Sequence, residues 1–543
     1  MTVRELGAAF FDRLNSHDPL GASLVGLTAY DAMLPDLRPE ADRAAAAFFR
    51  RIARDTGQAD GDDTDREVLR WMADTAADEA THCLWEANAS AMFCGSPQGS
   101  YFAAGAGLRL PGAARFFDGL ADRYWDASGR GRPSTRAGIE QAVAQLTEHL
   151  GRPVGDDDPH RRLIEDEVRP AMRRLADTLS GELAAVARDD EHAGIWAVSG
   201  GEAGYRAAVA AHTTLPVSPE EVQELGVRLL AELDEQWSRL GGEAFGLTDP
   251  VAMRARLRDD PDLRFTSAGE ILAAVAAALH RAEARGTEIS SVAAAVPCAV
   301  QPVPAEDAAA APAAYYAPPA GDGSRPGTFF VLTTEPRQLS RFAMEAMTFH
   351  EAVPGHHFQA VAAQGLGTLP DFRRHVDARL SAYVEGWALY AERLADEMGL
   401  YSSPLARLGQ VALAALRAAR LVTDTGLHAR RWSRDRARRF LREHTVESER
   451  SVCQEVDRYI AWPGQALAYS VGVREILRLR ESARAALGSR YRPAAFHDQV
   501  LGAGPVPLGV LATIIERWVK TEEQRPNGNI FAHDTTDIDT GRI

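Results

Sequence analysis

Four side chains close together in the sequence have the chemistry of a zinc site: His350, Glu351, His356 and His357. In zinc hydrolases the motif H-E-x-x-H places two imidazoles on one side of a helix, with the glutamate beside the metal. Here the histidines are six and seven residues apart, and seven residues of straight helix rise about 10 Å, too far for both imidazoles to bind one ion. A bulged turn at Pro354-Gly355 could return a later histidine to the metal, because proline breaks the helical ladder and glycine tolerates unusual dihedral angles. The alternative is a helix that stops at Pro-Gly and carries surface histidines.

A third ligand is suggested downstream by Glu385, which lies in the helical pattern LSAYVEGWALYAERL. Its neighbours Tyr383 and Trp387 indicate a buried setting, and a buried carboxylate needs a cation or hydrogen-bond partners. Two histidines and a glutamate would leave an open zinc position for water. Glu385 could instead be an exposed helical acid.

An amide hydrolase also needs donors for the charge that develops on the carbonyl oxygen. Tyr459 and Tyr469 flank a Pro-Gly break, and both could project into a cleft. Arg458, and Arg325 in the sequence DGSRPG, are candidates for binding a substrate carboxylate through two hydrogen bonds. The alternatives are tyrosines that pack with a satisfied hydroxyl group and arginines in internal salt bridges.

Asp424 and His428 are four residues apart, so that they could meet on one face of a helix. The functional interpretation is an acid that orients a histidine behind the metal ligands, or a histidine that donates to the oxyanion. The alternative is a cap at a helix end, with Gly426 as the stop signal.

Helix starts are the clearest structural signals around these residues. Ser218-Pro-Glu-Glu221 is a capping box with proline at the first helical position. The stretch 266–270 shows the same kind of helix-start signal, and a further helix should begin at Ser403-Pro404. The best strand is 328–334, which is β-branched and aromatic and could pair with an extended peptide if it lies at a cleft edge.

Composition excludes several classes of protein. The chain has 543 residues, of which 45% are hydrophobic and 25% charged, as in folded globular proteins. A net charge of −16 argues against a nucleic-acid partner. The uncharged run 289–305 is interrupted by prolines and is no membrane span, and the N-terminal sequence lacks a signal-peptide core. Because the four cysteines show no disulfide spacing, we expect a soluble, cytoplasmic protein with no membrane partner.

The length predicts two or three lobes or one large helical fold. We expect an N-terminal helical region at 1–210, a catalytic region at 211–523 and a polar C-terminal tail at 524–543. The first boundary rests only on a Gly/Pro-containing stretch near 192–218.

Several ordered motifs resemble one bacterial family. They are HEAVPGHHFQ, YVEGWALYAERL, RAARLVTDTGLHARRWS, RYIAWPGQALAYSVG and FHDQVLGAGPVPL, with DGSRPGTFFV upstream. The family is known as a domain of unknown function (number 885) and is grouped with zincin-like, gluzincin-type metallopeptidases. The resemblance implies a mainly α, large helical zincin-like fold with a deep central cleft and a small β element next to the metal helix.

By the same resemblance, His350 is the first ligand, Glu351 the general base and Glu385 the third ligand. The second ligand is His356, with His357 as the alternative. We expect a zinc-dependent hydrolase of amide bonds, a peptidase acting on short peptides or amino-acid conjugates. The alternatives are a zincin repurposed for a specialised metabolite and a non-catalytic peptide-binding protein, and the sequence leaves the oligomeric state open.

Overall fold

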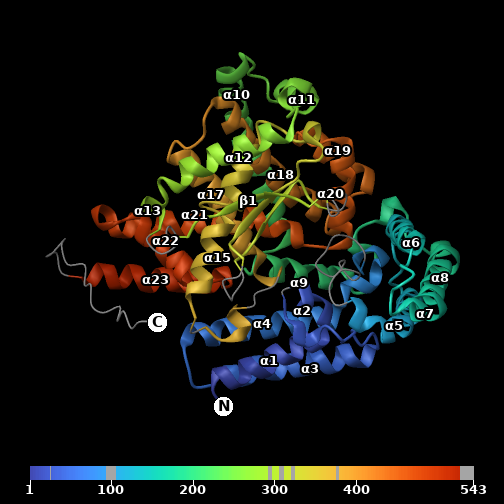
Figure 1. Ribbon diagram of the computed structural model, residues 1–543. Helices are drawn as coiled ribbons and strands as arrows, with labels where there is room; N and C mark the ends of the chain where they lie inside the picture. The colour runs from blue at the N-terminus through green and yellow to red at the C-terminus, as the bar shows by residue number, and fades with distance from the viewer. Residues whose placement is uncertain are drawn as a thin grey trace.

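The computed structural model describes residues 1–24, 26–92, 106–290, 296–304, 308, 311–319, 325–367, 369–374 and 378–525. These residues form a mainly helical protein with one small sheet, which confirms the expected mainly α class (Figure 1). Apart from residues 524 and 525, the predicted polar tail lies outside the described residues.

Nine α-helices precede residue 214 in the described ranges, and α1, α3 and α4 pack together while α5, α6 and α8 form a group beside them (Figure 1). Their bounds are α1 Val3–His17, α2 Pro19–Leu24, α3 Pro39–Thr56, α4 Asp63–His82, α5 Ala106–Gly129, α6 Arg136–Gly151, α7 Arg161–Leu163, α8 Arg169–Thr178 and α9 Gly201–Thr213.

The second part of the chain contains the remaining α-helices of the described residues, among them α14, α15 and α17, which carry the predicted site. They are α10 Pro219–Phe245, α11 Pro250–Asp259, α12 Ala268–Glu283, α13 Gly286–Ile289, α14 Met344–Glu351, α15 His356–Gly365, α16 Asp371–Arg374, α17 Ser381–Glu397, α18 Pro404–His428, α19 Arg434–His444, α20 Glu449–Ala461, α21 Ala468–Leu487, α22 Pro493–Gly502 and α23 Leu508–Gln524. The three predicted helix starts are confirmed, because the side chains of Ser218, Ser267 and Ser403 accept hydrogen bonds from the first turns of α10, α12 and α18.

The sheet has the strand order β1-β3-β2, with β1 Ala299–Pro302, β2 Ala314–Ala317 and β3 Thr328–Val331. β3 is the predicted strand, although it ends at Val331 rather than at residue 334. It pairs in parallel with β1 and antiparallel with β2. The suggestion that this strand binds an extended peptide is therefore wrong, because both of its edges are already paired.

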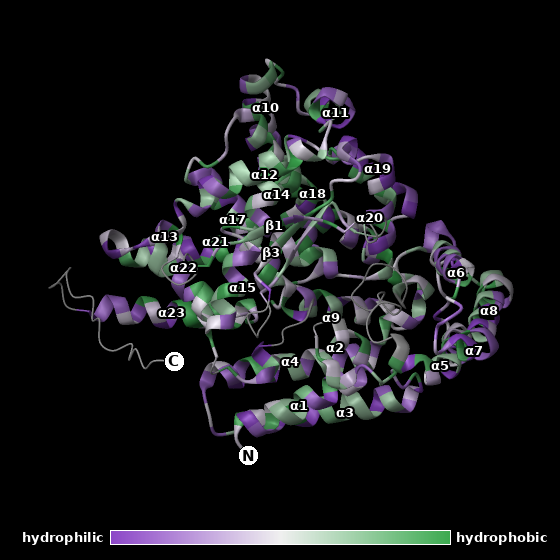
Figure 2. Cartoon of the chain, viewed as in Figure 1, coloured by the Kyte–Doolittle hydropathy of each residue, from purple (hydrophilic) through white to green (hydrophobic). Residues whose placement is uncertain are grey.

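The largest hydrophobic core joins both ends of the chain. It contains Phe10 and Val68 from the N-terminal helices together with Phe349, Trp387 and Ile515. Figure 2 shows polar residues on the outer helices and apolar residues toward the middle. This core extends across the expected boundary near residue 210 and therefore does not mark it. The boundary stays a prediction.

α17 and α21 cross at very short range. A Cβ atom added at Gly386 would lie 2.7 Å from the backbone of Gly472, so the two glycines permit this approach. The crossing lies directly beside Glu385, the predicted third ligand. Close packing of two long helices thus fixes the backbone from which this carboxylate projects.

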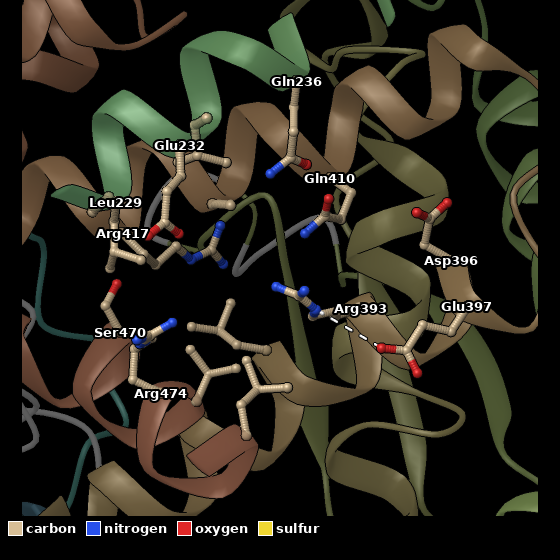
Figure 3. Close-up of a pocket in the computed structure, with 16 residues that line it drawn as sticks. Leu229, Glu232, Gln236, Arg393, Asp396, Glu397, Gln410, Arg417, Ser470 and Arg474 are labelled. Atoms are coloured by element: carbon tan, nitrogen blue, oxygen red, sulfur yellow. Dashed lines mark ion pairs between the residues drawn. The ribbon is translucent and has the colours of Figure 1, made fainter. Parts of the chain in front are cut away.

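A cavity of about 270 Å³ lies between α10, α17, α18 and α21 (Figure 3). The deep central cleft expected from the resemblance stays a prediction. None of the described helices has the length and apolarity needed to cross a bilayer. Cys83, Cys298 and Cys453 are free thiols.

Candidate metal centre

The chain breaks between the two predicted histidine ligands. α14 ends at Glu351 and α15 begins at His356, so the insertion forms a complete interruption rather than a bulge within one helix. A Cβ atom at Gly355 would lie 1.8 Å from the carbonyl oxygen of His350, which explains why glycine is needed there. The indole Nε1 of Trp387 donates to the carbonyl oxygens of Pro354 and Gly355 at 2.9 and 3.2 Å. The break is therefore held against α17.

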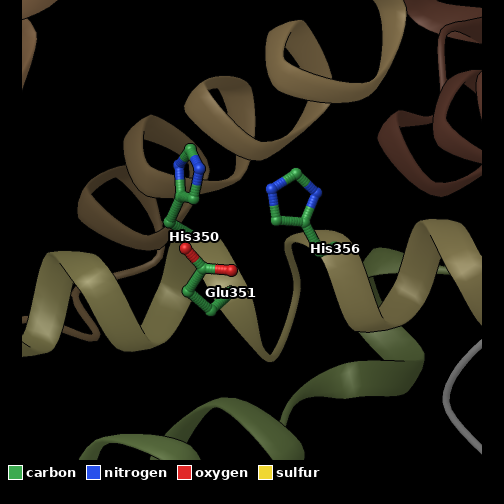
Figure 4. A group of neighbouring side chains, drawn as sticks. All are labelled: His350, Glu351 and His356. Atoms are coloured by element: carbon green, nitrogen blue, oxygen red, sulfur yellow. The ribbon is translucent and has the colours of Figure 1, made fainter. Parts of the chain in front are cut away.

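This break brings His350, Glu351 and His356 together (Figure 4). One potential ligand atom from each residue lies within 4.8 Å of the others. The two imidazole rings are 4.9 Å apart between centroids and nearly perpendicular.

Glu385 completes the group from α17. Its Oε2 lies 3.4 Å from Nε2 of His350 and 3.8 Å from Nε2 of His356. Oε2 is buried and accepts no hydrogen bond among the described residues. A carboxylate oxygen in this state needs a cation, because burial without a partner is costly.

These distances fit zinc. Two ligands about 2.1 Å from one tetrahedral ion lie roughly 3.4 Å apart. The separations of Glu385 Oε2 from the two histidine nitrogens are close to that value. Two imidazoles and one carboxylate are also a donor set found in catalytic zinc sites, with a fourth position left for water.

Glu392 fixes the orientation of His350 from behind. Its Oε1 lies 2.8 Å from Nδ1 of His350, and the Glu392 side chain is fully buried. An imidazole that donates from Nδ1 keeps Nε2 free for a metal, and carboxylate partners of this kind also make the ring more basic. Glu385 and Glu392 are seven residues apart, two helical turns, so both face the same side of α17.

The electrostatics of the group favour a positive charge at its centre. Burial opposes protonation of His350, but the nearby carboxylates of Glu385 and Glu392 outweigh it and raise the pKa of this imidazole to about 10. Burial also opposes ionisation of Glu385, yet His350 and His356 bring its pKa down to about 2. Burial lowers the pKa of His356 to about 4, so this ring is neutral and able to act as a ligand.

Glu351 lies beside these residues with a different pKa. Burial, reinforced by the charge of Glu385, raises the pKa of the Glu351 carboxyl group to about 7, against the opposing charge of His350. A carboxylate with a pKa near the working pH can both accept and return a proton. This property suits the general-base role that the resemblance implies.

His357 has hydrogen-bond partners outside the metal group. Its Nδ1 lies 2.9 Å from the hydroxyl of Tyr316 on β2, and its Nε2 lies 2.8 Å from the carbonyl oxygen of Val296. Both ring nitrogens are engaged, so His357 attaches α15 to the sheet. Of the two histidines left open by the sequence, the structure thus brings His356 to Glu385.

The predicted tyrosines differ in their surroundings. Tyr459 is fully buried, and its hydroxyl donates to Glu455 at 2.5 Å. Arg458 also contacts Glu455, at 3.2 Å, so that this arginine takes part in an internal ion pair rather than facing a substrate. Tyr469 lies under the guanidinium of Arg420, and burial together with the charge of Glu385 raises its pKa. Of the two predicted tyrosines, Tyr469 is therefore the one on which the charge of Glu385 acts.

The catalytic interpretation of His428 is wrong. Its Nδ1 accepts a hydrogen bond from the backbone of Ile195 at 3.0 Å, and its Nε2 lies 3.0 Å from the carbonyl oxygen of Tyr459. No ring nitrogen remains for an oxyanion. Asp424 does not orient this histidine either, because its carboxylate accepts from the hydroxyl of Tyr205 and the amide of Gly464.

A structural role for His428 predicts a specific pH effect. Burial lowers its pKa to about 3, whereas an unfolded histidine titrates near 6.5. The unfolded chain therefore binds more protons below pH 6.5, and this residue makes stability fall as the pH drops from about 6.5 toward 3. His428→Gln should lower the free energy of unfolding at pH 8 by about 1–3 kcal/mol. It should also flatten the decline between pH 7 and 5, measured by urea unfolding, and an unchanged slope would contradict this role.

Arg325 is exposed and precedes β3. Burial raises the pKa of the Tyr316 phenol, and the charge of Arg325 acts against this rise. The arginine is thus near β2, but nothing among the described contacts brings it to the metal group.

Two residues at the site were not among the sequence predictions. Glu392 could have been found from its seven-residue spacing to Glu385, which places both acids on one face of a helix. Arg417 on α18 acts on the metal group by its charge, which favours the ionised carboxylates of Glu351 and Glu385 and the neutral ring of His356. No local sequence signal distinguishes Arg417 from the many other arginines of the chain.

Two solved structures are similar in fold to nearly the whole chain. A crystal structure described as a "putative lipoprotein" from Colwellia psychrerythraea is similar with a TM-score of 0.85 and 24% identity, over 96% of this chain and 99% of that one. A second, described as a "putative lipoprotein of unknown function" from Shewanella oneidensis, has a TM-score of 0.74 and 17% identity, over 95% and 100% of the two chains. These likenesses establish the fold alone. No curated protein sequence matches the chain. A family model matches residues 19–515, and the chain therefore belongs to the family described as bacterial protein of unknown function (DUF885).

Proposed function

We propose that the protein is a zinc-dependent hydrolase of amide bonds that acts on short peptides or amino-acid conjugates. One observation carries the proposal: the buried Oε2 of Glu385 lacks a hydrogen-bond partner and faces Nε2 of both His350 and His356. Glu351 lies beside this group, where a general base is needed. Three protein ligands would leave one position for water, whereas a purely structural zinc site uses four protein ligands.

The residues around the group would have separate roles in hydrolysis. Zinc bound by His350, His356 and Glu385 would supply a Lewis acid and lower the pKa of water. Glu351 would accept the proton of the attacking water and return it to the leaving nitrogen. Glu392 would keep the ring of His350 oriented. Tyr469 would donate to the developing oxyanion, since the hydroxyl of Tyr459 is already bonded to Glu455.

The test compares zinc-loaded and metal-free protein on one panel of substrates. The panel contains di- to pentapeptides and N-acylated amino acids, and mass spectrometry measures the release of free amine. We expect hydrolysis by the zinc-loaded protein, loss after chelation and recovery on adding zinc. Inertness of the fully zinc-loaded protein toward every amide would contradict the proposal and favour the repurposed enzyme or the peptide-binding protein.

Glu392→Gln is expected to weaken zinc binding roughly 10- to 100-fold, because the amide no longer accepts a charge-assisted hydrogen bond from His350. Competition with a chromophoric chelator measures the affinity. Glu397→Gln is the matched control, since this acid lies on the same helix and pairs with Arg480 at 2.7 Å. Equal zinc affinities for Glu392→Gln and the wild type would show that Glu392 does not support the ligand.

A further inference from the structure

We propose that the cavity between α10, α17, α18 and α21 binds a free carboxylate of the substrate, with Arg417 as its anchor. This inference rests on the proposed function and makes it more specific. The substrate would be an N-acyl amino acid, or a peptide cleaved at its last amide bond, so that the residue leaving as the amine carries the carboxylate.

The acidic side chains that line the cavity are partly paired with arginines outside it. Asp396 and Glu397 line it, but they are paired with Arg407 and Arg480, which do not line it, at 2.6 and 2.7 Å. Arg393 lies 3.8 Å from Glu397. Glu232 is the other acid that lines the cavity. With Asp396 and Glu397 neutralised from outside, the three lining arginines, Arg393, Arg417 and Arg474, outnumber Glu232, and the cavity retains positive charge.

Arg417 has unused hydrogen-bonding capacity in this cavity. Its Nη1 donates to the carbonyl oxygen of Leu413 at 3.2 Å, and its buried Nε has no partner among the described residues. Figure 3 shows its guanidinium directed into the space between the four helices, with Arg474 on the neighbouring α21. A guanidinium with free donors in a planar arrangement matches a carboxylate.

The cavity is next to the candidate metal centre. Leu389 lines it and lies one helical turn after Glu385 on α17. Ser470 also lines it and directly follows Tyr469. The charge of Arg417 acts on Glu351, His356 and Glu385 together. A carboxylate held by Arg417 would therefore place the adjoining amide toward Glu351.

The remaining lining limits what else can enter. Aliphatic side chains contribute much of the surface: Leu229, Leu233, Leu389, Val473 and Leu477. A volume of about 270 Å³ suits one amino-acid residue rather than a long peptide. We therefore expect an aliphatic residue with a free α-carboxylate, and cleavage at the end of a chain rather than within it.

The test uses two substrates that differ in one group, acetyl-alanyl-leucine and acetyl-alanyl-leucinamide. The zinc-loaded wild type should prefer the free acid. Arg417→Gln should reduce kcat/KM for the acid roughly 10- to 100-fold and change the amide little, with zinc content unchanged. Arg478→Gln is the control, because this exposed arginine lies on α21, pairs with Glu475 and does not line the cavity. Equal losses on both substrates, or no preference in the wild type, would overturn the inference while leaving the proposed function intact.

A binding measurement separates the two proposals. Calorimetry on zinc-loaded Glu351→Gln compares acetyl-leucine with acetyl-leucinamide, with and without Arg417→Gln. Tighter binding of the acid that depends on Arg417 supports the inference even if no amide is hydrolysed. If Arg417→Gln does not fold, Arg474→Gln in the same cavity should reduce the acid preference in the same direction, and an unchanged preference there would overturn the inference.

Discussion

Glu351→Gln should lower kcat roughly 10²- to 10⁴-fold while leaving zinc content at the wild-type level. The amide has nearly the shape of the carboxylate but cannot accept the proton of the attacking water. Glu351 is not required to hold the metal, since His350, His356 and Glu385 supply three ligand atoms around one point. Metal analysis and peptide hydrolysis are measured on the same sample.

Glu345→Gln is the control for that variant. Glu345 lies on the same helix, α14, and pairs with Arg281 at 2.8 Å instead of facing the metal group. It should remain active. Full activity of Glu351→Gln would rule out the general-base mechanism.

The second large effect distinguishes the adjacent histidines. His356→Ala should lose zinc on dialysis, because only His350 and Glu385 would remain as ligands and two protein ligands rarely hold zinc tightly. His357→Ala should keep zinc and lose about 1–3 kcal/mol of stability, since it removes the bonds to Tyr316 and Val296. Atomic absorption and thermal unfolding measure the two properties. Full zinc in His356→Ala would show that the ligand assignment is wrong.

The sequence predicted the local features of this site better than its three-dimensional contacts. Capping residues such as Ser218 and Ser403 act within one helical turn, so they mark helix starts without knowledge of the fold. The H-E pair and the Pro-Gly break likewise identify where α14 ends. The same local logic cannot say that the break separates two helices, because Trp387 of α17 holds it in place.

Contacts between distant segments explain the errors. His428 and Asp424 have the residue types of a catalytic pair, but Ile195, Tyr205 and Gly464 satisfy them as buried structural groups. The sequence of β3 favours a strand but carries no signal that β1 and β2 pair with both of its edges.

Zinc K-edge absorption of the protein, purified without chelator and supplied with zinc, tests the central claim most directly. The edge height gives the metal content and the fine structure gives the ligand types. We expect about one zinc per chain, with nitrogen and oxygen ligands at about 2.0–2.1 Å and imidazole scattering. Two results would contradict a centre built from His350, His356 and Glu385. One is a protein that retains no zinc on purification and takes up none when it is added, and the other is zinc bound through sulfur at about 2.3 Å.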